Sequence, residues 1–480
     1  MMNLNLFYAL PEIFLLAITM VILLVDAFSK TGKGVTPLTL IALVGAFLLQ
    51  GFCFRGKSEE AFNGMFILDT LAQGMKFITY ITSMVIVVYI RSYLVDKKIA
   101  LGQFYAIFLF AILGMLTMIS ANNMLILYVG LELLSLALYG LIAMNTHNVR
   151  ATEAAMKFFI LGALASGILL YGISFIYGAT GGKLQLNEVF ETIQQMFANG
   201  HSTMMLMFGI VFLVAGLAFK LGLVPFHMWI PDVYEGAQMP VVTIIATVTK
   251  VAALTFVIRF LIGGLILASP SWATMLEFLG ILSLFVGNIV AIAQTNIKRM
   301  LGYSTISHMG FVAFGLMCVT VDGISATIFY IIAYVITTLL AFGILTVLSY
   351  GNYECQTIDD LKGLSRNHPV YAALLLVAML SLAGIPPFIG FYAKFKILAA
   401  MVYTEHTATA VYAVIMSLIG AFYYLRVIKV MYFDDKQNEL TIPTIGFFHR
   451  SLLLANGFAV VAFGIFPNIL ILFSLGLIGG

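Results

Sequence analysis

The stretch Leu217–Lys250, LAFKLGLVPFHMWIPDVYEGAQMPVVTIIATVTK, decides the fold. It places Lys220 near the end of one apolar run, interrupts that run with three prolines, and places Lys250 midway along the next run. A lysine at the centre of a membrane helix costs at least about 2.5–3.5 kcal/mol, so such residues face a protein interior and mark ion paths. The alternative, extension of the side chain to the membrane surface, suits Lys220 better than Lys250. The stretch therefore predicts a broken membrane helix flanked by two functional lysines.

Composition places the whole chain in a lipid bilayer. Of the 480 residues, 62% are hydrophobic and only 9% are charged, whereas soluble domains carry about 25% charged residues. The net charge of +3 and the scattered basic residues make nucleic acid an implausible partner. Cys53, Cys318 and Cys355 form no CxxC or Cys/His cluster, so we predict no metal site and no cofactor bound to this chain.

Apolar runs long enough to cross about 30 Å of hydrocarbon follow one another along the chain. About fourteen such runs predict an all-α polytopic membrane protein. A short surface helix at Lys183–Gly200 separates the sixth run from the seventh. The runs are Leu4–Val25, Pro37–Phe54, Phe66–Ile90, Gly102–Ile119, Met124–Met144, Ala151–Tyr177, Thr203–Leu223, Val241–Phe260, Thr274–Gln294, Met300–Val319, Gly323–Ser349, Tyr371–Ala400, Ala408–Val430 and Arg450–Leu475.

Lys and Arg residues are concentrated in alternate loops. Loops after odd-numbered spans carry most of them, and the positive-inside rule makes these loops cytoplasmic. With an even number of spans, both termini then lie on the outer side, which is periplasmic for a bacterial inner membrane. The inner-loop cations are Lys30, Lys33, Arg91, Lys97, Lys98, Arg150, Lys298, Arg299, Lys362, Arg366 and Lys436, against Arg55, Lys57 and Lys183 outside.

A second broken helix repeats the first. AGIPPFIGFYAKF at Ala383–Phe395 interrupts the twelfth span as LVPFHMWIP at Leu223–Pro231 interrupts the seventh. The two breaks are five spans apart, and this odd number places the two units upside down relative to each other in the membrane. Many transporters are built from such inverted repeats. The alternative is that prolines merely kink two ordinary helices. We predict a three-helix segment at 1–101, inverted five-helix repeats at 102–260 and 274–430, and a C-terminal helix at 431–480.

Four ionisable residues are isolated in apolar sequence, each in its own predicted helix: Glu132, Lys220, Lys250 and Lys394. Burial disfavours the charged form and a nearby opposite charge favours it, so Glu132 would hold Lys220 charged in one state and release it in another. We predict that these four side chains carry protons. Two alternatives stay open: a protonated glutamate that joins helices by hydrogen bonds, and fixed structural ion pairs at Lys250 and Lys394.

Three further residues are candidate relays. His227 lies inside the first break and His308 lies in GYSTISHMG at Gly302–Gly310, and histidine exchanges protons near neutral pH. A structural role beside the neighbouring serines is equally open for His308. Lys157 lies nearer a membrane face. A relay role and extension of its side chain to the membrane surface are equally open there.

Asp69 and Lys76, in the third span, have the spacing of one helical face, and we predict that they form a structural pair. No phosphate-binding loop, HExxH motif or Ser/His/Asp arrangement is recognisable, so covalent and metal catalysis are not predicted. Movement of a small cation remains, most simply a proton, with energy supplied from outside the chain.

Four motifs resemble the antiporter-like membrane subunits of respiratory complex I: LELLSLALYGLIA at Leu131–Ala143, KLGLVPFHMWIPDVYEGAQMPV at Lys220–Val241, NIKRMLGYSTISHMGF at Asn296–Phe311 and GIPPFIGFYAKF at Gly384–Phe395. The resemblance covers essentially the whole chain. It implies fourteen helices in two inverted five-helix repeats, and proton translocation driven by quinone reduction in distant subunits.

The same resemblance assigns residues and partners. It places the family's fifth-helix glutamate on Glu132 and its lysines of helices 7, 8 and 12 on Lys220, Lys250 and Lys394. Lysine at the last position favours the family branch that has lysine there over the branch that has glutamate. FMN, iron–sulfur clusters and quinone are implied in partner subunits of a hetero-oligomer, so this chain's own expected partners are those membrane subunits, the lipid bilayer and protons.

Three classes of function remain open at this point. The first is a proton-translocating subunit of the NADH:quinone oxidoreductase, with Glu132 and Lys220 as a switching pair, Lys250 as a central relay and Lys394 as the outer gate. The second is a membrane subunit of a multi-subunit sodium/proton antiporter, which has no redox partner. The third is a scaffold whose buried charges are structural. NADH-driven pumping separates the first from the second, and lysine-to-alanine variants test the third.

Overall fold

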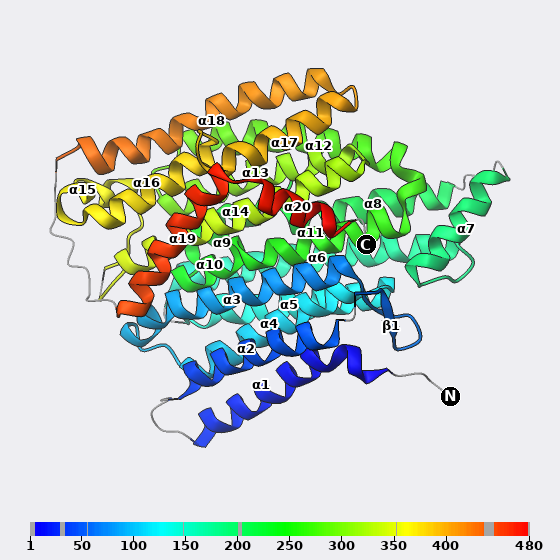
Figure 1. Cartoon of the computed structure of the whole chain (residues 1–480), viewed down its shortest axis with the longest axis horizontal. Coiled ribbons are helices and arrows are strands. Elements are labelled where there is room, and N and C mark those ends of the chain that lie inside the picture. Colours follow the sequence, from blue (N-terminus) through cyan, green and yellow to red (C-terminus); the bar gives the residue numbers. More distant parts are fainter. Residues whose placement is uncertain are drawn as a thin grey trace.

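The computed structural model describes residues 5–28, 34–54, 56–146, 148–199, 204–351, 353–435 and 446–478. Within these residues the chain forms one bundle of helices that run side by side (Figure 1). Several predicted features lie outside the described residues, namely the boundaries at Leu4, Gly200 and Thr203 and the loop cations Lys30, Lys33, Arg55 and Lys436.

The N-terminal segment holds three spans and a small hairpin. Its elements are a 3-10 turn η1 (Leu6–Ala9), α1 (Leu10–Phe28), α2 (Val35–Cys53), the antiparallel strands β1 (Glu59–Ala61) and β2 (Phe66–Leu68), and α3 (Thr70–Asp96). The predicted third span began at Phe66, but α3 begins after Asp69, whose side chain accepts from the Ala72 N–H at 2.8 Å. An aspartate at this position satisfies a free helix N–H, so the strand ends and the helix starts there.

The predicted pair of Asp69 and Lys76 is wrong. Lys76 Nζ lies 2.5 Å from Glu12 Oε1 of α1. Asp69 instead accepts two hydrogen bonds from Arg259, at 2.6 and 2.7 Å. Two helical turns separate Asp69 from Lys76 by about 10 Å along the axis, so each side chain reaches a partner on another helix more easily. Burial raises the pKa of Asp69, but the Arg259 guanidinium and its hydrogen bonds outweigh burial and hold it below the ordinary value of 3.8.

The next part of the chain departs from the prediction mainly at its eighth span. Predicted as continuous over Val241–Phe260, this span is interrupted at Thr247, and its last turns are π-helical. The predicted surface helix exists, and it buries Leu186, Val189 and Ile193. The elements are α4 (Leu101–Ser120), α5 (Met124–Ala143), α6 (Val149–Ala179), the surface helix α7 (Leu186–Ala198), α8 (Met204–Leu221), α9 (Trp229–Gly236), α10 (Met239–Ala246), α11 (Val248–Ile258), η2 (Arg259–Gly264) and η3 (Ile266–Ala268).

The last part of the chain contains the central helix of the bundle, α14 (Figure 1). Its apolar stretch is 94% buried, and it packs against α3, α10, α16, α17 and α19. The predicted C-terminal span, Arg450–Leu475, is divided at Pro467, which has no N–H to continue the helix. The elements are α12 (Ser269–Ile292), α13 (Ile297–Met317), α14 (Val321–Leu348), η4 (Ile358–Leu361), α15 (Leu364–Asn367), α16 (Pro369–Ala383), α17 (Ile389–Tyr403), α18 (Thr407–Phe433), α19 (Phe447–Ile465) and α20 (Asn468–Gly476).

The number of spans agrees with the prediction. Within the described residues, twelve helices are long and apolar enough to cross a membrane. The 21-residue α13, which is more polar, and the broken pair α16–α17 complete the predicted fourteen. The start of α1, the end of α20, the β1 hairpin and α7 lie at one end of the bundle (Figure 1).

Two matched backbone bridges occur at opposite ends of the bundle. Asn123 caps α5 and pairs with Gln185 just before α7, while Asn296 caps α13 and pairs with Thr357 just before η4. Backbone hydrogen bonds of 2.8–3.0 Å flank both bridges. One bridge adjoins α7 and the other lies toward α15, at the far end (Figure 1). Two units of opposite orientation would produce this pattern, and it supports our proposed division into units 102–260 and 274–430, with 1–101 and 431–480 outside them.

Candidate functional site

Each broken helix leaves one backbone carbonyl without its usual donor. In α8 the Leu221 carbonyl would accept from Pro225, and in α16 the Ala383 carbonyl would accept from Pro387, but proline has no N–H. The next residue in each break is a glycine with positive φ, +88° and +85°, which turns the chain out of the helix. Both free carbonyls therefore lie at the C-terminal, partially negative end of a helix.

Each of these carbonyl oxygens accepts a hydrogen bond from a lysine. Lys250 Nζ donates to Leu221 O at 3.1 Å, and Lys394 Nζ donates to Ala383 O at 2.9 Å. A cation in such a position is stabilised by about 0.3–1 kcal/mol, and by up to about 2 kcal/mol when partly buried. Each ammonium also lies over an aromatic ring, at 5.5 and 5.6 Å from the ring centroids. Among the described residues neither lysine forms an ion pair, which does not favour the interpretation of fixed ion pairs.

Glu132 of α5 and Lys220 of α8 do not form an ion pair in this structure. Lys220 Nζ donates to Ser135 Oγ at 2.7 Å, and the Ser166 hydroxyl of α6 donates to the Glu132 carboxylate. Ser135 follows Glu132 by about one turn on α5. The acid and the amine are therefore each hydrogen-bonded to a different serine and not to each other.

His308 of α13 is buried between two tyrosine hydroxyls. Its Nδ1 lies 2.7 Å from Tyr330 Oη and its Nε2 lies 3.1 Å from Tyr424 Oη. Tyr424 Oη is also 2.5 Å from Ser304 Oγ, so the neighbouring serine reaches the imidazole only through a tyrosine. A neutral imidazole carries one N–H, so His308 donates to one tyrosine and accepts from the other.

More hydroxyl groups extend this cluster toward α9. Thr305 Oγ1 lies 2.9 Å from Tyr334 Oη and donates to Tyr234 Oη at 3.4 Å. The Tyr334 and His308 rings are 5.2 Å apart. Sequence reasoning missed these tyrosines. The four-residue spacing of Tyr330 and Tyr334 in an otherwise aliphatic run was an available indication, because a buried tyrosine hydroxyl requires a hydrogen-bond partner.

Lys157 and His227 lie apart from the interior lysines. Both line a cavity of about 450 Å³ together with Asp232 and Arg299. The Lys157 side chain is 45% exposed and forms ion pairs with Glu153 at 2.8 Å and Asp232 at 2.9 Å, and Arg299 reaches Asp232 at 2.8 Å. Of the three candidate relays, only His308 lies in the buried polar cluster.

Fold and site together define a class of protein. The chain is a membrane bundle with two broken helices, each of which presents a free carbonyl to a lysine, and buried hydroxyl and imidazole groups lie between the two breaks. This is the antiporter-like architecture of ion-translocating membrane subunits.

Residues 121–463 match the NADH:quinone oxidoreductase/Mrp antiporter transmembrane family, and the chain belongs to that family. It is 48% identical over 469 residues to NADH-quinone oxidoreductase subunit N of Laribacter hongkongensis, covering 97% of this chain and 96% of that protein. Subunit N is the branch that Lys394 favours.

Solved structures agree with this assignment. A chain of respiratory complex I from Thermus thermophilus with bound aureothin matches with a TM-score of 0.81 and 31% identity, over 96% of this chain and 98% of that chain. A chain of the Mrp complex from Dietzia sp. matches with a TM-score of 0.80 over 99% and 96% of the two chains, and its 20% identity indicates a shared fold alone.

Proposed function

We propose that Glu132, Lys220, Lys250 and Lys394 carry protons through this chain. The chain is a proton-translocating membrane subunit of an NADH:quinone oxidoreductase, respiratory complex I, and is part of an enzyme although its proposed role is proton movement rather than redox chemistry. We place it in a bacterial inner membrane with both termini periplasmic. Its partners are the other membrane subunits of complex I, and FMN, iron–sulfur clusters and quinone belong to partner subunits.

The observation that carries this proposal is the position of Lys250 and Lys394 on carbonyls that proline has left free. Each ammonium contacts a backbone carbonyl at a helix end and an aromatic ring. Among the described residues, no carboxylate forms an ion pair with either lysine. A lysine held in this way can lose its proton without leaving a buried anion behind. A fixed structural ion pair would prevent such a loss, because the remaining carboxylate would be buried and unpaired.

In the proposed mechanism, proton affinity at the first break follows the distance between Glu132 and Lys220. When the two approach, Lys220 leaves Ser135 and holds its proton; when they separate, the proton moves toward Lys250. His308 and its tyrosines then connect the central region to Lys394. Each charge moved against about 100 mV costs on the order of 2.3 kcal/mol, which quinone reduction in the partner subunits supplies.

Lys157 and His227 are assigned a different step. They line the 450 Å³ cavity beside the first break, at the end of the bundle that the positive-inside rule makes cytoplasmic. We propose that they relay protons from that side toward Lys220. The ion pairs of Lys157 with Glu153 and Asp232 fit a surface role equally well. The relay role therefore requires that a Lys157→Met variant take up fewer protons from the cytoplasmic side.

The decisive experiment compares Lys250→Met and Lys394→Met in membranes that contain the whole complex. We expect NADH-driven proton pumping to fall about tenfold or more, which corresponds to about 1.4 kcal/mol or more, in sodium-free medium. The matched control is Lys429→Met, because that side chain is 70% exposed and lies at the end of α18. Normal pumping by an assembled complex with either interior variant would contradict the proposal, and pumping that required sodium would favour the antiporter alternative.

A further inference from the structure

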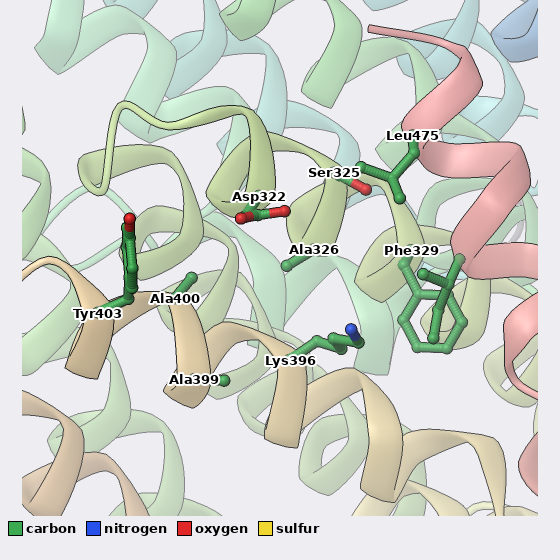
Figure 2. A pocket seen from close by; sticks show the side chains of 10 residues that line it. Asp322, Ser325, Ala326, Phe329, Lys396, Ala399, Ala400, Tyr403 and Leu475 are labelled. Atoms are coloured by element: carbon green, nitrogen blue, oxygen red, sulfur yellow. The ribbon is translucent and has the colours of Figure 1, made fainter. Parts of the chain in front are cut away.

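A cavity of about 270 Å³ lies between α14, α17 and α20, away from the side chains assigned above. Asp322, in the first turn of α14, and Lys396, on α17, line it. Figure 2 shows Lys396 extending into the space between the two helices, with Phe329 and Leu475 toward one end and Tyr403 toward the other. Tyr403 is 81% exposed, so the cavity is open at that end. In the proposed orientation this is the outer end of the bundle.

The two charged groups in this cavity form no ion pair with each other or with another described residue. Lys396 is two residues from Lys394, which on a helix is a rotation of about 200°, so the two lysines point to different sides of α17. Ser325, Ala326 and Ala400 form much of the remaining wall. Phe329, Ile471 and Leu475 make the rest of the wall apolar, and the two charged side chains offer hydrogen-bond partners to water.

A smaller cavity of about 10 Å³ lies further along the same two helices. Its lining includes His308, Thr337 and Ser381, and its volume is close to the minimum that one water molecule requires, about 10–15 Å³. On each of the two helices, five of the residues that line the cavities recur every three or four positions, so these five lie on one face of their helix. These residues are Asp322, Ser325, Phe329, Ala333 and Thr337 of α14, and Gly390, Ala393, Lys396, Ala400 and Tyr403 of α17.

Along α14, Phe329 lies between Ser325 of the outer cavity and Ala333 of the inner cavity. It lines the outer cavity and is 1% exposed, while Ala333, one turn or about 6 Å further along α14, lines the inner cavity. A bulky apolar side chain between two cavities that each contain polar side chains is the arrangement of a hydrophobic constriction, which blocks ion movement by excluding water.

We propose that the outer cavity is the proton-release vestibule of this chain, with Phe329 as its gate. A proton that leaves Lys394 passes through the His308 cavity when water crosses the Phe329 layer, reaches the Asp322 carboxylate and leaves from there to bulk water. Lys396 is a positioning residue, because its ammonium lines the same cavity as the Asp322 carboxylate and can hold water beside that carboxylate. This inference rests on the proposed function and adds an exit route to it.

Access to the vestibule is tested with a membrane-impermeant cationic methanethiosulfonate reagent. In the whole complex, Ser325→Cys is expected to react from the outer side at least tenfold faster than the wild-type chain, because Ser325 lines the cavity and the three buried cysteines do not. Thr327→Cys, on the opposite face of α14, is the matched control and should not react. Ala333→Cys should react only when Phe329→Ala is also present. Reaction of Ser325→Cys from the inner side alone, no reaction, or equal reaction of Thr327→Cys would overturn the proposal.

Function is tested with Lys396→Met and Asp322→Asn, singly and together, beside Lys250→Met and the Lys429→Met control. We expect at least threefold less pumping for each NADH oxidised in the double variant, with the complex assembled. If Lys250→Met stops pumping while the double variant pumps normally, the vestibule is wrong and the proposed function stands. If Lys250→Met also pumps normally, the proposed function itself is wrong.

Discussion

The interior lysines of this bundle rest on oxygen atoms that carry no full charge. Lys220 contacts a serine hydroxyl, and Lys250 and Lys394 contact backbone carbonyls. Such partners stabilise the ammonium by less than a carboxylate would, and they do not oppose its deprotonation with a buried negative charge. At the scale of single residues, we propose that these uncharged partners allow the three lysines to exchange protons.

Ser135→Ala tests this view at the first break. The variant removes the hydrogen bond from Lys220, and a hydrogen bond to a charged group contributes about 1.5–3 kcal/mol. We expect NADH-driven pumping to fall about tenfold, equivalent to about 1.4 kcal/mol, with assembly preserved. Ser135→Thr keeps the hydroxyl and should pump normally. Full pumping by Ser135→Ala would mean that Lys220 does not depend on this serine.

Asp69→Asn tests the ion pair with Arg259, whose side chains are 18% and 10% exposed. Removing one partner of a buried pair costs about 3–5 kcal/mol, so the thermal midpoint of the purified complex should fall. The pKa of Asp69 is held below its ordinary 3.8 by Arg259 against the effect of burial, so the contribution of the ionised pair is complete above that value and is lost as the pH falls through the lower folded pKa. The difference from wild type should be constant between about pH 8 and pH 5 and should shrink below about pH 4.

The control for this measurement is Asp359→Asn. Asp359 forms a surface pair with Lys362, and its side chain is 67% exposed. Exposed pairs contribute about 0–1 kcal/mol, so this variant should change the midpoint little at any pH. A shift as large as that of Asp69→Asn would indicate general sensitivity to charge rather than a buried pair.

The sequence was enough to select the residues that we propose as proton carriers, but it did not predict which residues they contact. Glu132, Lys220, Lys250 and Lys394 stand out because charge is rare in apolar runs. Their serine and carbonyl partners depend on distances between helices, which the order of residues does not contain. The wrong pairing of Asp69 with Lys76 has the same cause, since helical spacing describes one helix and ignores Glu12 and Arg259 on others.

At the scale of elements, the two breaks were predictable because proline removes a donor and glycine permits positive φ. The interruption of the eighth span at Thr247 was not, because VVTIIATVTK contains neither residue. There the Thr247 hydroxyl donates to the Thr243 carbonyl at 2.5 Å, and such side-chain bonding competes with the backbone ladder. The hairpin of β1 and β2 was missed because its three-residue strands are too short for a periodic pattern.

Gly384→Ala is the sharpest test of a break. Gly384 has φ +85°, and an added Cβ would lie 2.8 Å from Lys394 Cδ and 3.2 Å from its Nζ. The variant should therefore displace the lysine from the Ala383 carbonyl, in addition to a backbone strain of about 1–2 kcal/mol, and pumping should fall severalfold. Gly351→Ala is the control, because Gly351 has φ +63° and no atom within 4 Å of the added Cβ. An equal loss in both variants would assign the effect to strain alone.

At the scale of the whole molecule, charge bias and an even number of spans predict which ends of the bundle face which side. Glu405 lies in the loop between α17 and α18, and Asp435 follows α18, so the two are expected on opposite sides of the membrane. Glu405→Cys should react with an impermeant thiol reagent from the periplasm, and Asp435→Cys from the cytoplasm. Reaction of both from one side would contradict the path of α18, and the reverse result would invert the proposed orientation.

The carbonyls of Leu221 and Ala383 are available only while their helices stay interrupted. Rewinding either interruption, or pulling its two halves apart, would withdraw the oxygen beneath a neighbouring ammonium and make that proton easier to release. Displacement of a helix segment by an adjoining subunit would thus remove the hydrogen-bond partner of a buried lysine without the binding of any ligand to this chain.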